Sequence, residues 1–259
     1  MDKLPKKLYY VWVGNKPKPE IFHKCFKSWQ EKLPEYEIIE INENNFDMEY
    51  HLKKNRFFKE CYEKELWAYV ADYMRAHYLY KRGGIYLDID MEIVKNFSEI
   101  IEIEDMDFFA GFESDDGIGM GLFGVSAESR FLEELIDFYE DEIWKSPLFT
   151  MPQITKYILK NKFLCNLSKD EVRDQENGIY VYPKESFYPF LPGEIFKKEM
   201  LTEKTYAIHW WYHSWKGSRP FLFLKTKHLR GIKKYIKKIG IYFQIFRDNF
   251  RNKNKINLN

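Results

Sequence analysis

Two acidic residues, Asp88 and Asp90, follow the apolar run Ile85-Tyr86-Leu87 and are separated by a single position. If the predicted strand continues through them, both carboxylates lie on one face at its carboxyl end. Open α/β sheets bind their ligands beyond such ends. Two carboxylates there repel each other unless a cation lies beside them, and Mg²⁺ or Mn²⁺ suits such oxygen ligands. The spacing therefore indicates a site for a divalent cation.

A cation in this position has an obvious chemical use. Bound to the diphosphate of a nucleotide, it would neutralise the charge that develops as a sugar–phosphate bond breaks. Asp72 and Arg75, spaced i, i+3 on a predicted helix, share one face and could hold a ribose or sugar hydroxyl and a phosphate. A surface ion pair of little energetic value is the alternative for these two residues.

The elements that must position these residues follow an α/β pattern. The run Leu8–Val13 predicts a strand, the apolar spacing of Pro19–Leu33 predicts a helix, and Tyr36–Ile41 predicts a second strand. This order favours a parallel sheet. Further helices are predicted at 67–80 and 129–144, and further strands at 85–87, 108–112 and 122–125. The chain beyond Pro147 reads as irregular, because prolines interrupt its aromatic runs.

Other motifs are weaker. Asp105-Met106-Asp107 repeats the acidic spacing, but we interpret it as a solvated turn. Gly119-Met120-Gly121-Leu122-Phe123-Gly124 has the spacing of a dinucleotide fingerprint, yet an acidic loop precedes it, so we reject an NAD site. A hinged loop beside an acceptor and an ordinary glycine turn fit it equally. The loop acids could bind acceptor hydroxyls or assist transfer, and simple solvation explains them as well: Glu113, Asp115 and Asp116.

Composition limits the class of protein. The 259 residues are 45% hydrophobic and 31% charged, which excludes a wholly disordered chain. No apolar run approaches the roughly 18 residues of a membrane-spanning helix, and the start of the chain runs directly into a strand, so we expect no signal peptide. Cys25, Cys61 and Cys165 show no paired spacing and suit the reduced thiols of a cytosolic protein. No nucleophile with a supporting base is visible, which argues against a serine or cysteine hydrolase.

The charges are unevenly distributed. From Arg219 to the end there are 12 basic residues and one acid, whereas the first 218 residues carry 29 basic and 39 acidic ones. We therefore expect a main domain over 1–218 and a basic appendage over 219–259. Within the appendage an apolar stripe repeats with helical spacing: Leu229, Ile232, Ile236, Ile239, Phe243, Phe246 and Phe250.

This stripe has two explanations that fit equally well. Four lysines lie away from it, so a helix could lie on an anionic membrane surface: Lys233, Lys234, Lys237 and Lys238. Alternatively, the stripe packs on the main domain. Nucleic acid is a poorer partner, because no nucleic-acid-binding motif accompanies the charge.

Three segments together resemble glycosyltransferase family 32. Trp67–Val94 is similar to its signature, the opening LPKKLYYVWVGNKPKPE to its first strand and helix, and AIHWWYHSW (207–215) to its closing segment. The family includes bacterial capsular and lipopolysaccharide sugar transferases and Och-type mannosyltransferases, and it is related to the glucosylating domain of large clostridial toxins. The resemblance implies a GT-A fold, Rossmann-like with a mostly parallel sheet, and metal-dependent, retaining sugar transfer.

The resemblance also implies roles for single residues. Asp88, Asp90 and His209 would form the metal site, and Arg75 would join the two acids in catalysis. Residues implied to bind the donor are Trp12 on the base, Asp72 and Arg75 on hydroxyls, Tyr86 and Asp88 in the pocket, and Ser214 and Trp215 at the diphosphate. From the residues alone, Trp12 fits a core position better and His209 a structural one. Met151 stands where related chains usually have glycine, which leaves the acceptor side open.

The resulting hypothesis is a transferase that uses Mn²⁺ or Mg²⁺ and adds a sugar to a saccharide or lipid-linked saccharide in bacterial surface polysaccharide synthesis. A UDP-sugar is the expected donor, with a GDP-sugar as the alternative. We expect the protein in the cytoplasm, peripheral on the inner face of the plasma membrane. A non-catalytic nucleotide-sugar or saccharide-binding module and a metal-dependent phosphohydrolase are the rival hypotheses.

Overall fold

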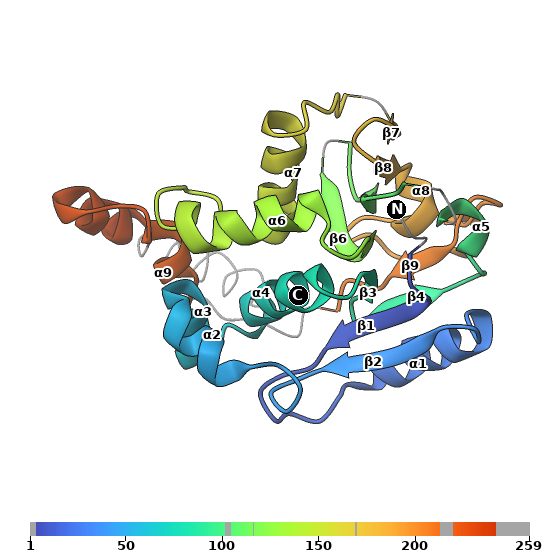
Figure 1. Ribbon diagram of the computed structural model, residues 1–259, viewed down its shortest axis with the longest axis horizontal. Helices are drawn as coiled ribbons and strands as arrows, with labels where there is room; N and C mark the ends of the chain where they lie inside the picture. Colours follow the sequence, from blue (N-terminus) through green and yellow to red (C-terminus); the bar gives the residue numbers. More distant parts are fainter. Residues whose placement is uncertain (1–3, 102–104, 116, 169, 213–219, 242–259) are drawn as a thin grey trace, which may run out of the picture.

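The computed structural model describes residues 4–101, 105–115, 117–168, 170–212 and 220–241, and Figure 1 shows their arrangement. The strands are β1 (Lys7–Val11), β2 (Glu37–Ile41), β3 (Gly84–Leu87), β4 (Met91–Ile93), β5 (Phe108–Phe112), β6 (Ile118–Val125), β7 (Val172–Asp174), β8 (Ile179–Tyr182) and β9 (Ala207–His209). The α-helices are α1 (Glu20–Lys32), α2 (Met48–Lys54), α3 (Arg56–Glu63), α4 (Trp67–Tyr80), α5 (Ser98–Ile101), α6 (Arg130–Asp137), α7 (Met151–Asn161), α8 (Lys184–Phe187) and α9 (Pro220–Thr226). A π-helical turn (Phe138–Glu142) continues α6, and a 3-10 turn (Lys198–Met200) precedes β9.

The centre of the molecule is a seven-stranded sheet with the order β2-β1-β3-β6-β5-β8-β7. The pairs β1–β2, β1–β3 and β5–β8 are parallel, while β6 and β7 run antiparallel to their neighbours. Most of the strands therefore run in one direction, and the predicted α/β class with a mostly parallel sheet is confirmed.

Helices cover both faces of this sheet, as the strands' side chains alternate between two cores. Tyr9 and Tyr86 belong to the larger core with α3, α4, α6 and α7, whereas Leu8 and Ile85 belong to the second core with α1. This alternation sends Tyr86 to the α4 face, and Asp88, two residues later, lies on the same side. The predicted helix at 67–80 is confirmed as α4, with both bounds.

A separate two-stranded sheet joins β4 to β9. A pair of this size is marginal by itself, and α1 holds it against the body. The indole nitrogen of Trp29 donates a hydrogen bond of 2.6 Å to the carbonyl oxygen of Met91, and Ser28 Oγ accepts one of 2.9 Å from the Ile93 N–H. The β4–β9 pair is therefore a fixed base for the residues at its ends.

The structure corrects the prediction for the region beyond Pro147, which contains α7, β7, β8, α8 and β9 rather than irregular chain. Pro152 lies in the first turn of α7, where its missing N–H is not needed for helical hydrogen bonds, so this proline marks a helix start. The strands were missed because β7 to β9 are only three or four residues long.

The glycine-rich segment at 119–124 is neither a hinged loop nor a turn, because it lies inside β6. Glycine is needed there for close packing. A Cβ atom at Gly119 would lie 2.3 Å from the Tyr188 ring, and one at Gly124 would lie 2.2 Å from the Phe109 ring.

The predicted solvated turn is wrong for Asp107, because this residue is buried. It accepts hydrogen bonds of 2.9 Å from the hydroxyl of Ser129 and the backbone N–H groups of Arg130 and Phe131, and so fixes the start of α6.

At the carboxyl-terminal end, α9 packs into the larger core through Leu224. Residues 231–241 then form a further helix, drawn in red at one end of Figure 1. The alternative in which the apolar stripe packs on the main domain is wrong for Ile232, Ile236 and Ile239, which are 55–75% exposed. Phe243, Phe246 and Phe250 lie outside the described residues. Among the described helices, none is both long and apolar enough to cross a membrane.

Candidate functional site

A cavity of about 520 Å³ opens where β1 and β3 end and where α4 and α7 begin. Its wall includes eight of the residues singled out from the sequence. They are Trp12, Asp72, Arg75, Tyr86, Asp88, Asp90, Glu113 and His209. The position agrees with the general rule that open α/β sheets bind ligands beyond the carboxyl ends of their strands.

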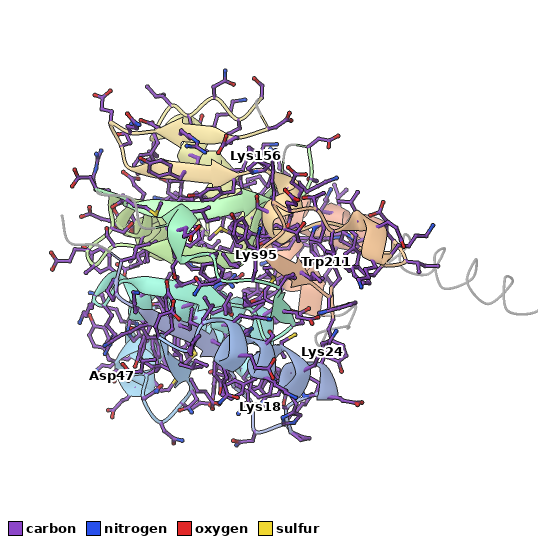
Figure 2. The ribbon with its side chains drawn as sticks, turned by 90° about the vertical axis from the view of Figure 1, so that its right-hand side faces the viewer. Lys18, Lys24, Asp47, Lys95, Lys156 and Trp211 are labelled. Atoms are coloured by element: carbon purple, nitrogen blue, oxygen red, sulfur yellow. The ribbon has the colours of Figure 1, made fainter. Side chains whose placement is uncertain are left out.

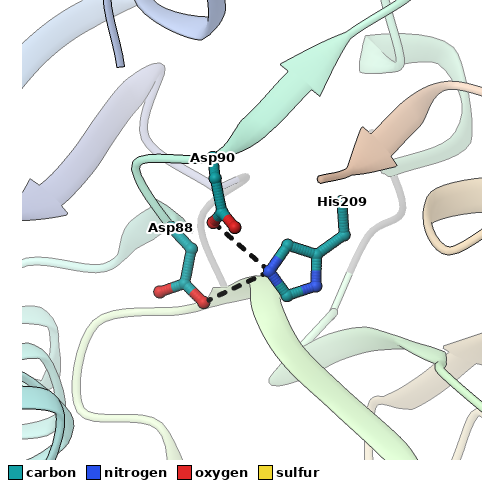
Figure 3. A group of neighbouring side chains, drawn as sticks. All are labelled: Asp88, Asp90 and His209. Carbon is teal, nitrogen blue, oxygen red and sulfur yellow. Dashed lines mark ion pairs between the residues drawn. The ribbon is translucent and has the colours of Figure 1, made fainter. Parts of the chain in front are cut away.

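Asp88, Asp90 and His209 form a compact group at this cavity (Figure 3). His209 Nε2 lies 3.3 Å from Asp90 Oδ1 and 4.0 Å from Asp88 Oδ2, and the ligand atoms of the three residues all lie within 4.8 Å of one another. Two carboxylates and one imidazole are ligands that divalent metals accept. The group could therefore hold a metal ion, as predicted.

The geometry of the acidic pair differs from the prediction in one respect. The strand ends at Leu87, and the Met91 N–H donates a hydrogen bond of 3.0 Å to the Asp88 carbonyl oxygen, closing a turn. A turn, rather than the alternation of an extended strand, therefore brings the two carboxylates together. The turn is required because the chain must leave the large sheet at β3 and enter the small one at β4.

Each carboxylate is held by its own contacts. Asp88 Oδ1 accepts hydrogen bonds from the Tyr86 hydroxyl at 2.9 Å and from Arg75 Nη1 at 3.2 Å. Asp90, which is 4% exposed, accepts one of 2.6 Å from the Tyr212 N–H at Oδ2, which leaves Oδ1 facing His209. These contacts reduce the freedom of both carboxylates before any ligand binds.

Arg75 is the buried cation behind the site. Its guanidinium forms ion pairs with Asp72 and Asp88, donates to the carbonyl oxygen of Met120 at 3.0 Å and lies over the Tyr86 ring at 4.3 Å. Burial raises the pKa of Asp72 to about 6, although the Arg75 charge opposes that shift. The predicted Asp72–Arg75 pair is thus an internal support of the cavity, and the surface alternative is wrong.

His209 is placed by its strand and by an aromatic neighbour. It ends β9, and its ring centre lies 4.0 Å from that of Trp211, which is labelled in Figure 2 on the segment after β9. Burial by itself would lower the pKa of His209, but the carboxylates of Asp90 and Asp88 outweigh it and raise the pKa. The second ring nitrogen, Nδ1, is buried and has no hydrogen-bond partner within the described part of the chain.

Trp12 is a partly buried wall residue rather than a core residue. Its indole nitrogen donates a hydrogen bond of 2.8 Å to the Lys16 carbonyl oxygen, which fixes the ring at the cavity edge. The implied donor residues Ser214 and Trp215 lie outside the described residues, as does Asp116.

Of the described acids in the loop after β5, Glu113 lines the cavity, and burial raises its pKa to about 7. Asp115 is exposed and does not line the cavity, and its place on the acceptor side stays a prediction.

Several wall residues were not expected from the sequence: Trp67, Thr150, Pro152, Gln153, Trp211 and Tyr212. The first turn of α7 could have been recognised from its proline. Met151 lies in that turn, but its side chain is completely buried in the larger core, and its backbone N–H donates a hydrogen bond to Asp72. Its side chain therefore does not narrow the cavity.

Comparisons with known proteins agree with this site. Residues 19–107 match the family described as "Glycosyltransferase sugar-binding region containing DXD motif". Lactosylceramide 4-alpha-galactosyltransferase from Pan troglodytes is 24% identical over 172 residues, which cover 61% of this chain and 45% of that protein. The enzyme of the same name from Mus musculus is 26% identical over 163 residues, which cover 58% of this chain and 42% of that protein. The chain thus spans less than half the length of these two relatives.

A solved structure supports the fold. The PaToxG glycosyltransferase superposes with a TM-score of 0.51 at 15% sequence identity, over 62% of this chain and 70% of that chain. The fold is of the GT-A type found in glycosyltransferases. The matched region contains Asp88 and Asp90, so this part of the chain is similar to glycosyltransferases that carry a DXD-containing sugar-binding region.

Proposed function

We propose that the protein transfers a sugar from a nucleotide diphosphate sugar to a saccharide acceptor, with a divalent cation held by Asp88, Asp90 and His209. The observation that carries this proposal is the convergence of these three side chains on one point of the cavity wall. When bound, Mn²⁺ or Mg²⁺ would supply positive charge to the departing diphosphate.

The chain's own residues have separate tasks in this proposal. Arg75 balances the negative charge of Asp88, and the Tyr86 hydroxyl fixes its orientation. Asp72 faces the cavity and could accept a hydrogen bond from a donor hydroxyl. Trp12 offers an aromatic ring that could contact the nucleotide base of the donor. The hydrogen bond from its indole nitrogen to the Lys16 carbonyl oxygen fixes this ring before the donor binds.

The acceptor would enter between Glu113 and the first turn of α7, because these elements form the wall away from β1. Burial keeps Glu113 near its titration point at neutral pH, so it could accept or share the acceptor's hydroxyl proton. We propose retention of anomeric configuration and a role in surface polysaccharide synthesis from the family resemblance.

A UDP-sugar is the donor that we propose. The curated relatives are named as 4-alpha-galactosyltransferases, so UDP-galactose belongs in the first panel, beside UDP-glucose and GDP-mannose. The decisive experiment measures release of the nucleoside diphosphate from each donor with Mn²⁺, with Mg²⁺ and with a chelator. Release that requires a cation supports the proposal, whereas equal release with the chelator contradicts the assigned role of the metal.

Two further measurements separate the two rival hypotheses. A non-catalytic binding module would show a donor-dependent rise in melting temperature without turnover. A phosphohydrolase would cleave a simple phosphate ester, which a transferase would not.

A further inference from the structure

The helix of residues 231–241 exposes an apolar face that nothing in the described structure covers. Four of its large hydrophobic side chains are between 55% and 75% exposed: Ile232, Tyr235, Ile236 and Ile239. The other large hydrophobic side chains that are exposed in the described residues are scattered along the chain: Tyr50, Leu164, Ile195 and Tyr212. Exposed apolar side chains that gather on one segment of helix indicate an interaction surface.

The helix is oriented with this face away from the body. At about 100° per residue, the four side chains fall within an arc of roughly 100°, and Ile241 points to the opposite side. Ile241 is 7% exposed and Ile232 is 75% exposed, so the apolar arc is the more exposed side of the helix. Figure 1 shows the helix projecting at one end of the molecule.

The helix is also attached firmly at its start. The Lys227 ammonium group donates hydrogen bonds of 2.6 Å and 2.8 Å to the carbonyl oxygens of Ser146 and Leu148. In α9, Phe223 packs edge-to-face on Trp144 at 5.9 Å. The helix of residues 231–241 therefore follows closely on a segment that is attached to the body.

The same helix carries four lysines, and their positive charge indicates a negatively charged partner. Lys233 and Lys237 are exposed, whereas Lys234 and Lys238 are half-buried. By helical position, Lys233 and Lys238 border the apolar arc on its two sides, from which long side chains can reach the headgroup level of a bilayer. We propose that residues 231–241 bind the surface of an anionic membrane, with the isoleucines among the lipid chains and the lysines at the phosphates.

A second copy of the chain explains these features less well. Pairing two such faces would bring the lysines of both helices together, and like charges repel. Pairing the face with the acidic body would leave the isoleucines without an apolar partner, since the exposed hydrophobic side chains described there are isolated. An anionic bilayer satisfies the apolar face and the lysines together.

Vesicle co-sedimentation of the full chain tests this proposal without any donor or acceptor, so its failure is separate from a failure of the proposed function. We expect binding to vesicles of phosphatidylcholine with phosphatidylglycerol, weaker binding to phosphatidylcholine alone, and a loss of binding as salt rises. The double variant Ile232→Gln/Ile236→Gln should reduce the partition coefficient by at least about tenfold. Ile195→Gln, an equally exposed isoleucine elsewhere, should leave it unchanged.

A charge variant separates the contribution of the lysines to membrane binding from that of the isoleucines. Lys233→Glu/Lys238→Glu, at the two lysines that border the apolar arc, should reduce binding to the anionic vesicles by at least about tenfold and leave the weak binding to neutral vesicles intact. The substituted isoleucines and Lys233 are exposed and Lys238 is half-buried, so melting temperatures should stay close to that of the wild type. No binding to anionic vesicles would overturn the proposal, as would unchanged binding by the isoleucine variant. Sedimentation equilibrium showing a dimer that the isoleucine variant loses would overturn it in favour of self-association.

Discussion

Met91 and His209 lie directly opposite each other in the antiparallel pair of β4 and β9. This register places the His209 imidazole beside the turn that carries the two aspartates, 3.3 Å from Asp90. The Trp210 N–H also donates a hydrogen bond of 3.0 Å to the Asp90 carbonyl oxygen, which continues the pairing past the strand end. The small sheet thus determines whether the three candidate metal ligands meet.

Asp90→Asn should reduce turnover about a hundredfold or more. It removes one negative charge from the group that would hold the cation, and a charge-stabilising group of this kind typically contributes that factor. Release of the nucleoside diphosphate with saturating Mn²⁺ measures the effect. Asp105→Asn is the matched control, because Asp105 is an exposed acid of the other Asp-x-Asp sequence. Equal activity of Asp90→Asn and the wild type would disprove the metal assignment.

Gly121→Ala should weaken Mn²⁺ binding about tenfold while the protein still folds. A Cβ atom at Gly121 would lie 3.0 Å from Asp88 Oδ2, so the carboxylate must move away from its place in the group. Calorimetric titration with Mn²⁺ measures the affinity. Gly240→Ala, where a Cβ atom would meet nothing within 4 Å, is the control. Unchanged affinity in the Gly121 variant would show that cation binding does not depend on the present position of Asp88 Oδ2.

Arg75→Met should lower the free energy of unfolding by about 3–5 kcal/mol, because it leaves the buried Asp72 carboxylate without its cation. Arg82→Met removes an exposed arginine just beyond the same helix and should cost less than about 1 kcal/mol. Adding Asp72→Leu to Arg75→Met should recover part of the loss. Urea unfolding measures all four proteins. If Arg75→Met costs no more than Arg82→Met, Arg75 does not support the fold.

His77 should contribute a loss of about 1–2 kcal/mol of stability between pH 7 and pH 5, whereas the raised pKa values of Asp72 and Glu113 contribute in the opposite direction. Burial lowers the pKa of His77 to about 3, from an ordinary value of 6.5. A group whose pKa is lower in the folded state contributes stability above its unfolded pKa, and that stability is lost as the pH falls toward the folded value. Burial lowers the pKa of neighbouring His51 as well, so it acts in the same direction.

Urea midpoints at the two pH values test this prediction in the wild type and in His77→Phe. The His77 ring packs at 4.2 Å between centres on Tyr73, and its Nε2 atom has no hydrogen-bond partner among the described residues, so phenylalanine should fit. Between pH 7 and pH 5 the stability of the variant should fall less, or rise more, than that of the wild type by about 1–2 kcal/mol. An unchanged slope in His77→Phe would place the responsible group elsewhere.

The sequence by itself determined the local features of the chain. α1 and the bounds of α4 could be predicted from the spacing of apolar residues and from the flanking proline and glycines. Helix periodicity and helix breakers act over a few neighbouring residues, so they can be recognised without the tertiary structure. The charge count likewise separated the basic end of the chain from the acidic body. The acidic pair after β3 could be found because its residue types and its place beyond an apolar run are both local.

Tertiary structure decided what depends on distant residues. Asp107 has the same spacing to Asp105 as Asp90 has to Asp88. Asp107 nevertheless fixes the start of α6, because its carboxylate accepts hydrogen bonds from Ser129 and from two backbone N–H groups of that helix. The strand character of Gly119–Gly124 depends on Tyr188 and Phe109 filling the space that side chains would occupy. His209 meets the aspartates only through the β4–β9 register. Such contacts join residues far apart in the chain. Their energies come from tertiary packing, which cannot be predicted from the types and spacing of neighbouring residues.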